Sequence, residues 1–568
     1  MTVPAGDRRR RRQLAPWALI ATLMAAATGA ALIGLATGPS PPAGIALPTL
    51  SSPIEAAPII GGQPPISGPL LSPGGPFLRD AKGRVVLLHG VNVVYKHPPY
   101  EVFPDPGKPW NFGVADASLM ARLGFDVVRL GMTWKGLEPG TAAANDPAIC
   151  TPGLPGDPHQ YDQAALDRYL SRLKETVDLL ARFHIFTILD MHQDVYNELF
   201  DGEGAPDWAV CTDGAPNVDP PGRWSRNYGT AAAGAAFENF WTNDVVGNLQ
   251  GQFDLVWGQV AKYFSTDPWV IGFDPFNEPF SASLVRFGDE HFDAQLECFY
   301  TGTAHVGTAL HGAPAVTCPP GDPATGVVPI LLANDPRALI FDEPDNYASR
   351  GLPTFLGPMP FPKLVFNFHV YCGARSPKTG NPTNLASCAR QEIRTLERRS
   401  EDRPEMASPH QHGGPAWFMS EFGATADPSL LSSITAHADE KLVGWAYWSW
   451  RFYADPTGSA AEALVMEDGR LRSTVQVLSR VYPEAVAGTP ISMSFDPLTG
   501  RFALEYRPGP RVRATTVVVV PMQVHFPHGY CPAVSGAKVV SGPTCPLLQL
   551  RNTGTGIVRL TIRAGRCA

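Results

Sequence analysis

Short apolar runs alternate with amphipathic helical patterns over Phe77–Pro483. In the clearest unit, apolar side chains recur at helical spacing over Leu166–Leu180, just after a candidate N-cap at Asp162. The compact apolar run Ile185–Leu189 follows and ends in polar residues. Repeated alternation of this kind predicts a parallel sheet covered by helices.

Eight runs in this region have the features of buried strands, because each is short, apolar and followed directly by polar or ionisable residues. The runs are Val85–Leu88, Phe125–Leu130, Ile185–Leu189, Val270–Phe273, Ala338–Phe341, Leu364–Phe368, Trp417–Met419 and Val443–Trp448. Eight strands suit an α/β fold of the closed (β/α)8 TIM barrel type, whose active site is built by the loops after the strands. An open doubly wound sheet is the alternative, but no GxGxxG turn follows the first strand.

After Pro483 the pattern changes to strand-like runs separated by Pro, Gly, Asp and Asn turns. These runs are Ile491–Phe495, Arg501–Tyr506, Thr515–Val520 and Ile557–Ile562. We therefore expect a catalytic barrel over 77–486 and a small C-terminal all-β, sandwich-like domain over 487–568. The pattern leaves open whether this domain stabilises the barrel or binds a ligand.

The N-terminus has the order of an export signal, because the basic run Arg8–Arg12 precedes the uncharged apolar stretch Trp17–Ala36. The stretch is also long enough to span a bilayer of about 30 Å. Residues 1–36 are thus a signal peptide or a membrane anchor, and both interpretations stay open. Residues 37–76 are rich in Pro, Gly and Ser and predict a flexible linker. We expect a secreted or extracytoplasmic protein.

Composition narrows the classes of partner and cofactor. The chain has 568 residues and a net charge of −8, and this mild acidity argues against a nucleic-acid binder. Its 44% of hydrophobic residues excludes a disordered chain. Its nine cysteines suit an oxidising compartment. Without CxxC spacing we expect neither a zinc site nor any other cofactor. If each cysteine pairs with its neighbour in the sequence, the disulfides join Cys150 to Cys211, Cys298 to Cys318, Cys372 to Cys388, and Cys531 to Cys545. Cys567 then stays unpaired.

Two strand ends carry the chemistry. Asn277, Glu278 and Pro279 follow one predicted strand. Glu421 follows the predicted strand that comes three strands later in the chain. In a barrel, both glutamates would face the same cleft. One carboxyl group could then protonate a leaving oxygen while the other attacks an anomeric carbon, with retained configuration if the two groups lie about 5 Å apart.

Several segments resemble glycoside hydrolase family 5 of clan A, and within it the endoglycoceramidases. They are Leu88–Lys96, Asp190–Asp194, Phe273–Pro279, Glu421–Gly423 and Gly444–Trp450. The resemblance covers the barrel and the appended β-domain. It implies that Glu278 is the acid/base and Glu421 the nucleophile of an enzyme that cleaves the bond between a glycan and ceramide.

The resemblance also implies roles for four residues around the two glutamates. Asn277 would donate to the sugar 2-hydroxyl, and Arg129 would hold Glu421 ionised. His369 would order the acid/base region, and the Tyr371 hydroxyl would donate to the nucleophile.

Four further residues would bind the sugar itself. His192 and Asp194 would grip hydroxyls, and Lys96 would contact the sugar beside the scissile bond. Trp448 would present its ring to an apolar sugar face. We expect Glu343, a rival carboxylate after the fifth strand, to line the cleft rather than to break bonds.

A lipid aglycone needs an apolar surface, which the stretches His97–Phe112 and Leu352–Phe361 could supply if they do not simply pack on each other. We expect a monomer that meets its glycolipid substrate at a membrane surface or micelle. The alternatives are a β-glucosidase acting on steryl glucoside or glucosylceramide, an endo-β-glucanase or mannanase, and a non-catalytic carbohydrate-binding protein on an inactive barrel.

Overall fold

The computed structural model describes residues 66, 68–157, 161–218, 224–281, 290–302, 318, 326–373, 382–542, 545–565 and 567. The predicted signal or anchor segment and most of the predicted linker lie outside these residues. Within the described part of the chain, no helix combines the length and apolar character needed to cross a membrane.

Eight parallel strands close into a barrel in the order β10-β3-β4-β5-β6-β7-β8-β9, which confirms the predicted fold class. Their bounds are β3 His89–Val93, β4 Val127–Met132, β5 Phe186–Met191, β6 Val270–Asp274, β7 Leu339–Asp342, β8 Leu364–Val370, β9 Ala416–Phe422 and β10 Gly444–Tyr447.

The first predicted strand is misplaced by several residues. Val85–Val86 forms β2, which pairs antiparallel with β1 (Leu78–Arg79) and β11 (Tyr482–Val486) outside the barrel. The barrel strand is instead β3, where Gly90 lies so close to β4 that an added Cβ would stand 1.9 Å from the Val127 carbonyl oxygen. A glycine is required there because the two backbones approach closely.

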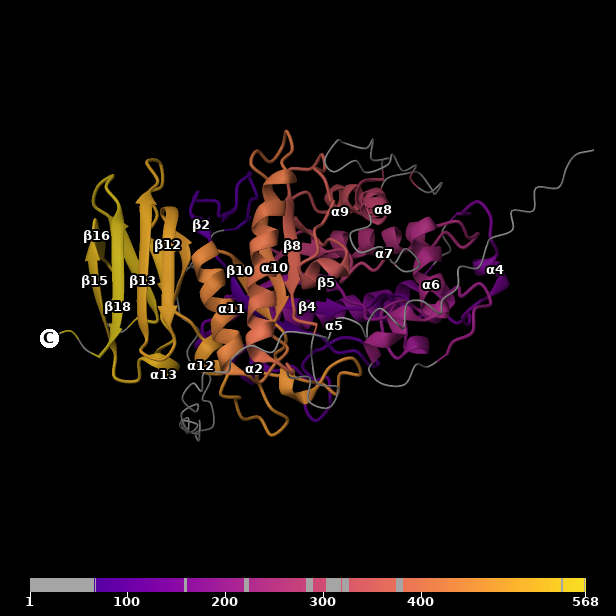
Figure 1. Cartoon of the computed structure of the whole chain (residues 1–568), viewed down its shortest axis with the longest axis horizontal. Coiled ribbons are helices and arrows are strands. Elements are labelled where there is room, and N and C mark those ends of the chain that lie inside the picture. Colours follow the sequence, from indigo (N-terminus) through magenta and orange to yellow (C-terminus); the bar gives the residue numbers. More distant parts are fainter. Residues whose placement is uncertain are drawn as a thin grey trace, which may run out of the picture. The chain divides into compact units, whose positions relative to one another are not determined.

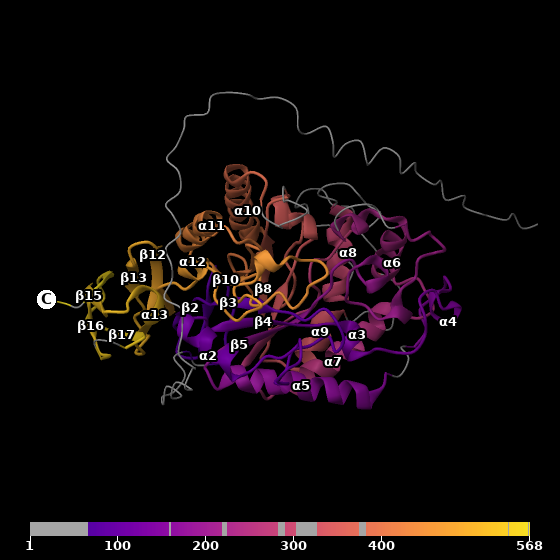
Figure 2. The same cartoon turned by 90° about the horizontal axis from the view of Figure 1, so that it is seen from below.

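Helices surround the barrel, and Figure 2 shows α5 and α10 on opposite sides of its strands. α5 begins at the predicted cap, where the Asp162 carboxylate accepts from two backbone N–H groups. The larger helices are α2 Val114–Leu123, α5 Gln163–Ala181, α6 Ala231–Thr242, α7 Leu249–Phe264, α8 Glu290–Thr301, α9 Val327–Asn334, α10 Leu385–Glu405 and α11 Pro428–Lys441. The short α-helices are α3 Trp134–Leu137, α4 Pro147–Cys150, α12 Val475–Leu478 and α13 Met522–His525, and the 3-10 helices include η2 Glu198–Phe200, η4 Trp224–Gly229, η6 Asn346–Arg350 and η7 Ala460–Glu462.

The C-terminal strands lie in two sheets, as the predicted sandwich requires (Figure 1), and one of these sheets also includes β1 and β2 from before the barrel. One sheet has the order β12-β13-β18-β15, and the other has the order β1-β2-β11-β14-β17-β16. Their buried faces share one apolar core that includes Phe495, Tyr506 and Leu560. The remaining bounds are β12 Gly488–Asp496, β13 Arg501–Pro508, β14 Thr516–Val519, β15 Tyr530–Ser535, β16 Ala537–Val539, β17 Leu547–Asn552 and β18 Val558–Ala564.

Ordered packing begins before Phe77. Leu70 is buried in an apolar cluster with Phe341 and Phe418 at the amino ends of the barrel strands. The Ser72 hydroxyl oxygen accepts from the Ala416 backbone N–H at 3.0 Å. The predicted flexible linker therefore does not extend through residue 76.

Three of the four predicted cysteine pairs form, namely Cys150–Cys211, Cys298–Cys318 and Cys372–Cys388. The fourth prediction is wrong, because Cys531 pairs with Cys567 and Cys545 is the free cysteine of the described residues. The antiparallel pairing of β15 with β18 sets Cys531 opposite Arg563, so the end of the chain lies beside it.

Candidate active site

The two predicted catalytic carboxylates face each other across His369. Glu278 follows β6, Glu421 lies in β9, and one oxygen of each lies within 4.8 Å of the other and of a His369 ring nitrogen. His369 Nδ1 is 2.9 Å from Glu278 Oε1 and 3.6 Å from Glu421 Oε2. This spacing matches the short separation typical of retaining glycosidases rather than the wider gap of inverting ones.

Arg129 and Tyr371 hold the Glu421 carboxylate from two sides. Arg129, fully buried on β4, donates to Glu421 Oε1 at 2.6 Å, and the Tyr371 hydroxyl donates to Oε2 at 2.9 Å. Burial nevertheless raises the pKa of Glu421 to about 7, while His369 and Arg129 oppose the rise. The predicted contacts are present, but they only partly offset the cost of burying the charge.

Arg129 is shared by several acidic side chains. Its guanidinium also donates to Asp190 at 2.9 Å, to Asp274 at 2.9 Å and to Glu343 at 3.0 Å. One cation therefore links β4, β5, β6 and β9 with the segment after β7. Such buried charges are stable only when they are paired and hydrogen-bonded, as they are here.

Glu343 supports the site electrostatically, through its contacts with Arg129 and His369. It is buried and forms an ion pair with His369 Nε2 at 3.0 Å. Burial favours its neutral form, but His369 and Arg129 lower the pKa of Glu343 to about 2. For His369, burial opposes protonation, yet the charges of Glu343 and Glu421 raise its pKa well above the ordinary value. These charges favour the protonated form of His369, which lies between Glu278 and Glu421.

Asn277 connects Arg129 to the segment that follows β5. Its Oδ1 accepts from Arg129 at 2.8 Å, and its Nδ2 donates to the Gln193 carbonyl at 2.9 Å. An amide nitrogen carries two hydrogens, so the second remains for a sugar hydroxyl.

Lys96 lies in a buried cluster of acidic and hydroxyl groups. Its ammonium donates to Asp194 at 2.5 Å and to Thr457 at 2.6 Å. Asp455 lies 3.3 Å and Glu203 3.4 Å from the same nitrogen. Burial disfavours the charge, but these carboxylates raise the pKa of Lys96 well above its ordinary value. Lys96 and Asp194, which the sequence predicts as separate sugar-binding residues, are therefore ion-paired with each other.

Trp448 lies beside His192 and Lys96. Its ring stacks on His192 with centroids 5.2 Å apart, and Lys96 Nζ lies 4.8 Å from the ring centroid. Its two neighbours in the aromatic cluster are fully buried: Trp445 stacks on His89, and Trp450 donates to Asp116. Trp448 is thus the tryptophan of the three that faces the predicted sugar-binding residues.

His192 is oriented by a carboxylate behind it. Its Nδ1 lies 2.7 Å from Asp190 Oδ2, and burial lowers the pKa of His192 well below its ordinary value. Its Nε2 lies 3.9 Å from both Asp194 and Glu203. A neutral ring held in this way can exchange a hydrogen bond with a sugar hydroxyl.

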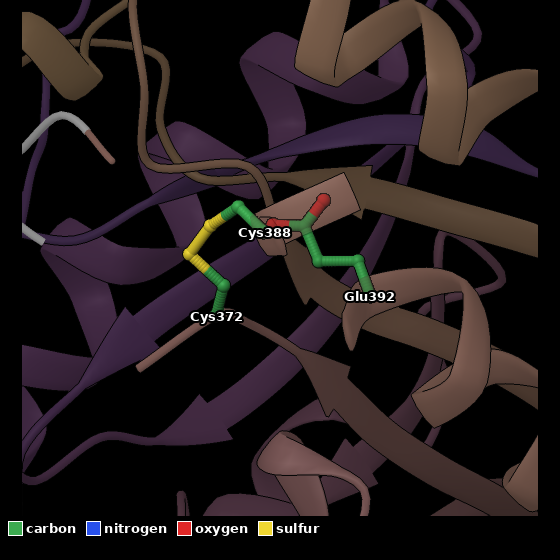
Figure 3. Close-up of side chains that lie close together, drawn as sticks. All are labelled: Cys372, Cys388 and Glu392. Atoms are coloured by element: carbon green, nitrogen blue, oxygen red, sulfur yellow. A yellow bond between two sulfur atoms is a disulfide. The ribbon is translucent and has the colours of Figure 1, made fainter. Parts of the chain in front are cut away.

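A disulfide anchors the segment that carries Tyr371. Cys372 follows Tyr371 directly and is bonded to Cys388 on α10 (Figure 3). The buried Glu392 carboxylate lies beside this bridge on the next turn of α10. The bridge ties the end of β8 to the helix that follows it, and thereby limits where the Tyr371 hydroxyl can lie.

The predicted aglycone loops are partly packed into the protein. Leu356 and Met359 are buried, whereas Phe355 is half-buried. Phe103 and Trp110, in the loop after β3, are half-buried and contact each other with centroids 6.1 Å apart. Apolar surface is therefore present on this face, but in smaller amounts than the sequence indicates.

Sequence reasoning missed Glu203, Asp455, Thr457 and Asn346. The first three surround Lys96, and Asn346 Nδ2 donates to Glu278 Oε2 at 2.6 Å. All four lie in loops after barrel strands, which is the one positional signal that could have identified them.

Comparisons with known proteins show what the chain is similar to. The model of the cellulase family, glycosyl hydrolase family 5, matches residues 112–454, and that of the family 5 C-terminal domain matches residues 480–562. Endoglycoceramidase I of Rhodococcus hoagii is 28% identical over 510 residues, which cover 87% of this chain and 88% of the relative. An endoglycoceramidase of Cyanea nozakii is 28% identical over 484 residues, with coverage of 80% and 84%.

The structure of endo-glycoceramidase II from a Rhodococcus species in complex with ganglioside GM3 superposes with a TM-score of 0.66. It is 24% identical, and the match covers 86% of this chain and all of that one. That likeness supports the fold, whereas the family model spans more than half of the chain. The chain is therefore a glycoside hydrolase and belongs to family 5.

Proposed function

We propose that this enzyme is an exported endoglycoceramidase that hydrolyses the bond between a glycan and ceramide with retention of configuration. The observation that carries the proposal is the close approach of Glu278 and Glu421, both held by His369. Similarity to endoglycoceramidases over most of the chain supports the choice of substrate.

In the first step, Glu421 attacks the anomeric carbon while Glu278 gives its proton to the glycosidic oxygen. The bond to ceramide breaks, an ester to Glu421 forms, and ceramide leaves as the neutral alcohol. We assign the attack to Oε2, because it lies 3.6 Å from the His369 nitrogen that also contacts Glu278, whereas Oε1 is bound by Arg129. Arg129, bound to the other oxygen, stabilises the carboxylate before attack and after its release.

In the second step, Glu278 takes a proton from water, and the water oxygen replaces Glu421 at the anomeric carbon. The products are a free reducing glycan and the regenerated pair of carboxyl groups. The site residues supply proton transfer, a nucleophile and fixed charge, so each step balances without a further reactant.

The wall formed by Lys96, Asp194, His192 and Trp448 is suited to the sugar on the glycan side of the bond. Trp448 offers an aromatic face, and the polar groups beside it can donate to and accept from hydroxyls. A glycolipid substrate would be met at the micelle or membrane that holds its lipid.

Export is supported by two independent features. The arginine run followed by an apolar stretch has the order of a signal segment. Eight of the nine cysteines are disulfide-bonded, which is typical of proteins in oxidising compartments.

A substrate panel tests the proposal. We would incubate the enzyme with lactosylceramide, ganglioside GM3, glucosylceramide, a steryl glucoside and cellulose, and identify products by mass spectrometry. We expect intact oligosaccharide and ceramide from the first two, and NMR should show the β-anomer of the sugar first. Turnover of cellulose or steryl glucoside alone would exclude the ceramide assignment, and first release of the α-anomer would exclude the covalent intermediate.

A further inference from the structure

The second oxygen of the Glu278 carboxylate has a donor of its own, supplied by the segment after β7. Asn346 is the first residue of η6, shortly after β7, and its Nδ2 donates to Glu278 Oε2 at 2.6 Å. The Asn346 backbone N–H also donates to the Pro279 carbonyl at 2.7 Å. The loops after β6 and β7 are therefore joined at the carboxyl group that transfers the proton.

Glu278 is held at each of its polar ends. His369 contacts Oε1 at 2.9 Å, Asn346 contacts Oε2, and Glu343 accepts from the Glu278 backbone N–H at 3.0 Å. The Glu278 backbone has a φ of 45°, in the left-handed region that a glutamate rarely adopts. Such a conformation persists only where the surroundings fix it.

We propose that Asn346 is a positioning residue for proton transfer by Glu278, a proposal that rests on the proposed acid/base role of Glu278. The terminal torsion of a glutamate side chain has a broad energy profile and is not fixed by the backbone. Donors at both oxygens stop the carboxyl group from turning, so that its proton stays directed at the glycosidic oxygen. Proton transfer requires this alignment within hydrogen-bond distance.

The proposal predicts a selective defect. A glycoside with a poor leaving group, such as an alcohol, needs the proton as its bond breaks, whereas a dinitrophenyl glycoside leaves without one. Loss of the donor should therefore slow the first class and spare the second. A general loosening of the site would slow both classes alike.

The test uses Asn346→Ala and the near-isosteric Asn346→Asp, which replaces the donor by an acceptor. We would measure kcat/KM for lactosylceramide, octyl β-lactoside and 2,4-dinitrophenyl β-lactoside. For Asn346→Ala we expect a loss of about tenfold or more on the first two and of less than about threefold on the third, since general acid catalysis is worth about 10²–10⁴-fold in total. Asn346→Asp should lose more than Asn346→Ala, despite its unchanged volume.

Gln391→Ala is the matched control. Gln391 donates to the Arg350 carbonyl at 3.2 Å and so supports η6 at the end opposite to Asn346. The relative kcat/KM values of Gln391→Ala on the three substrates should equal those of the wild type. Equal losses on all three substrates in Asn346→Ala, or no loss on any, would overturn the proposal.

The two lactosides with alcohol leaving groups separate this proposal from the substrate assignment. A wild-type enzyme that cleaves octyl β-lactoside but not lactosylceramide would refute the ceramide assignment alone. The ratio between octyl and dinitrophenyl lactoside would then still decide the role of Asn346.

Discussion

The two ends of the barrel are built from the same strands but by opposite means. Toward the carboxyl ends, buried ionisable side chains of Arg129, Asp190, Asp274 and Glu421 lie within reach of one another. The amino ends are closed by an apolar cluster whose barrel-strand members are Val127, Phe186, Ile188, Ile271, Leu339, Phe341, Val365, Ala416, Phe418 and Ala446. β4 shows the contrast within three residues, because it runs from Val127 to Arg129.

The amino ends of the strands stabilise the fold, whereas the carboxyl ends hold the reactive groups. Burial of apolar groups stabilises the fold at the amino ends, where each large side chain contributes on the order of a few kcal/mol. At the carboxyl ends, the cost of desolvating charges is offset by pairing, so the network gives little net stability. Substitutions at the two ends should therefore affect different measurements.

The largest effect is expected at the nucleophile. Glu421→Ser removes the attacking carboxylate and should lower kcat by about 10⁴-fold or more, because no other group can form the covalent ester. The fold should be retained, since a buried charge with a raised pKa is removed. Turnover of lactosylceramide and thermal unfolding would be measured on the same preparation.

Binding of the glycolipid should survive in Glu421→Ser, as judged by calorimetry with lactosylceramide micelles. The exposed carboxylate Glu440 on α11 offers the control, because its side chain is 70% exposed and Glu440→Ser leaves the site untouched. Near-normal turnover in Glu421→Ser would exclude the nucleophile assignment.

The opposite result is expected at the amino ends. Phe341 is fully buried in the apolar cluster and packs edge-on against Phe418, with centroids 5.9 Å apart. Phe341→Ala leaves a cavity and should lower the free energy of unfolding by about 3–5 kcal/mol. kcat at a temperature where the variant is folded should change by less than about twofold. A Phe341→Ala variant with full stability but low kcat would contradict the proposal that the amino ends serve stability and the carboxyl ends serve catalysis.

The sequence was informative wherever local pattern decides position. Glu278 and Glu421 could be singled out because each comes directly after an apolar run in the sequence, and strand ends converge in a barrel. The first strand was misassigned because Val85–Val86 is as apolar as a barrel strand, and its partner β11 lies some 400 residues later in the chain. Pattern alone does not distinguish these two kinds of sheet.

Contacts between separate loops could not be predicted from the sequence. Asn346 meets Glu278, and Asp455 meets Lys96, only because loops from different strands fold over the same opening. The Cys531–Cys545 pairing failed for a related reason, since nearness in sequence was used where sheet register decides.

The smallest effect tests the charge balance at the carboxyl ends. Burial raises the pKa of Glu421, and His369 is the largest of the influences that oppose the rise. His369→Asn removes that cation, so the pKa of Glu421 should rise further, by about one unit. Glu421 must be ionised to attack, so activity is present above its pKa and lost as the pH falls. The acid limb of the kcat/KM profile should therefore move to higher pH.

Tyr371→Phe removes a hydrogen bond from the same carboxylate but no charge, and should move the limb less. Equal shifts in both variants, or none in His369→Asn, would show that hydrogen bonding rather than charge sets the ionisation of Glu421.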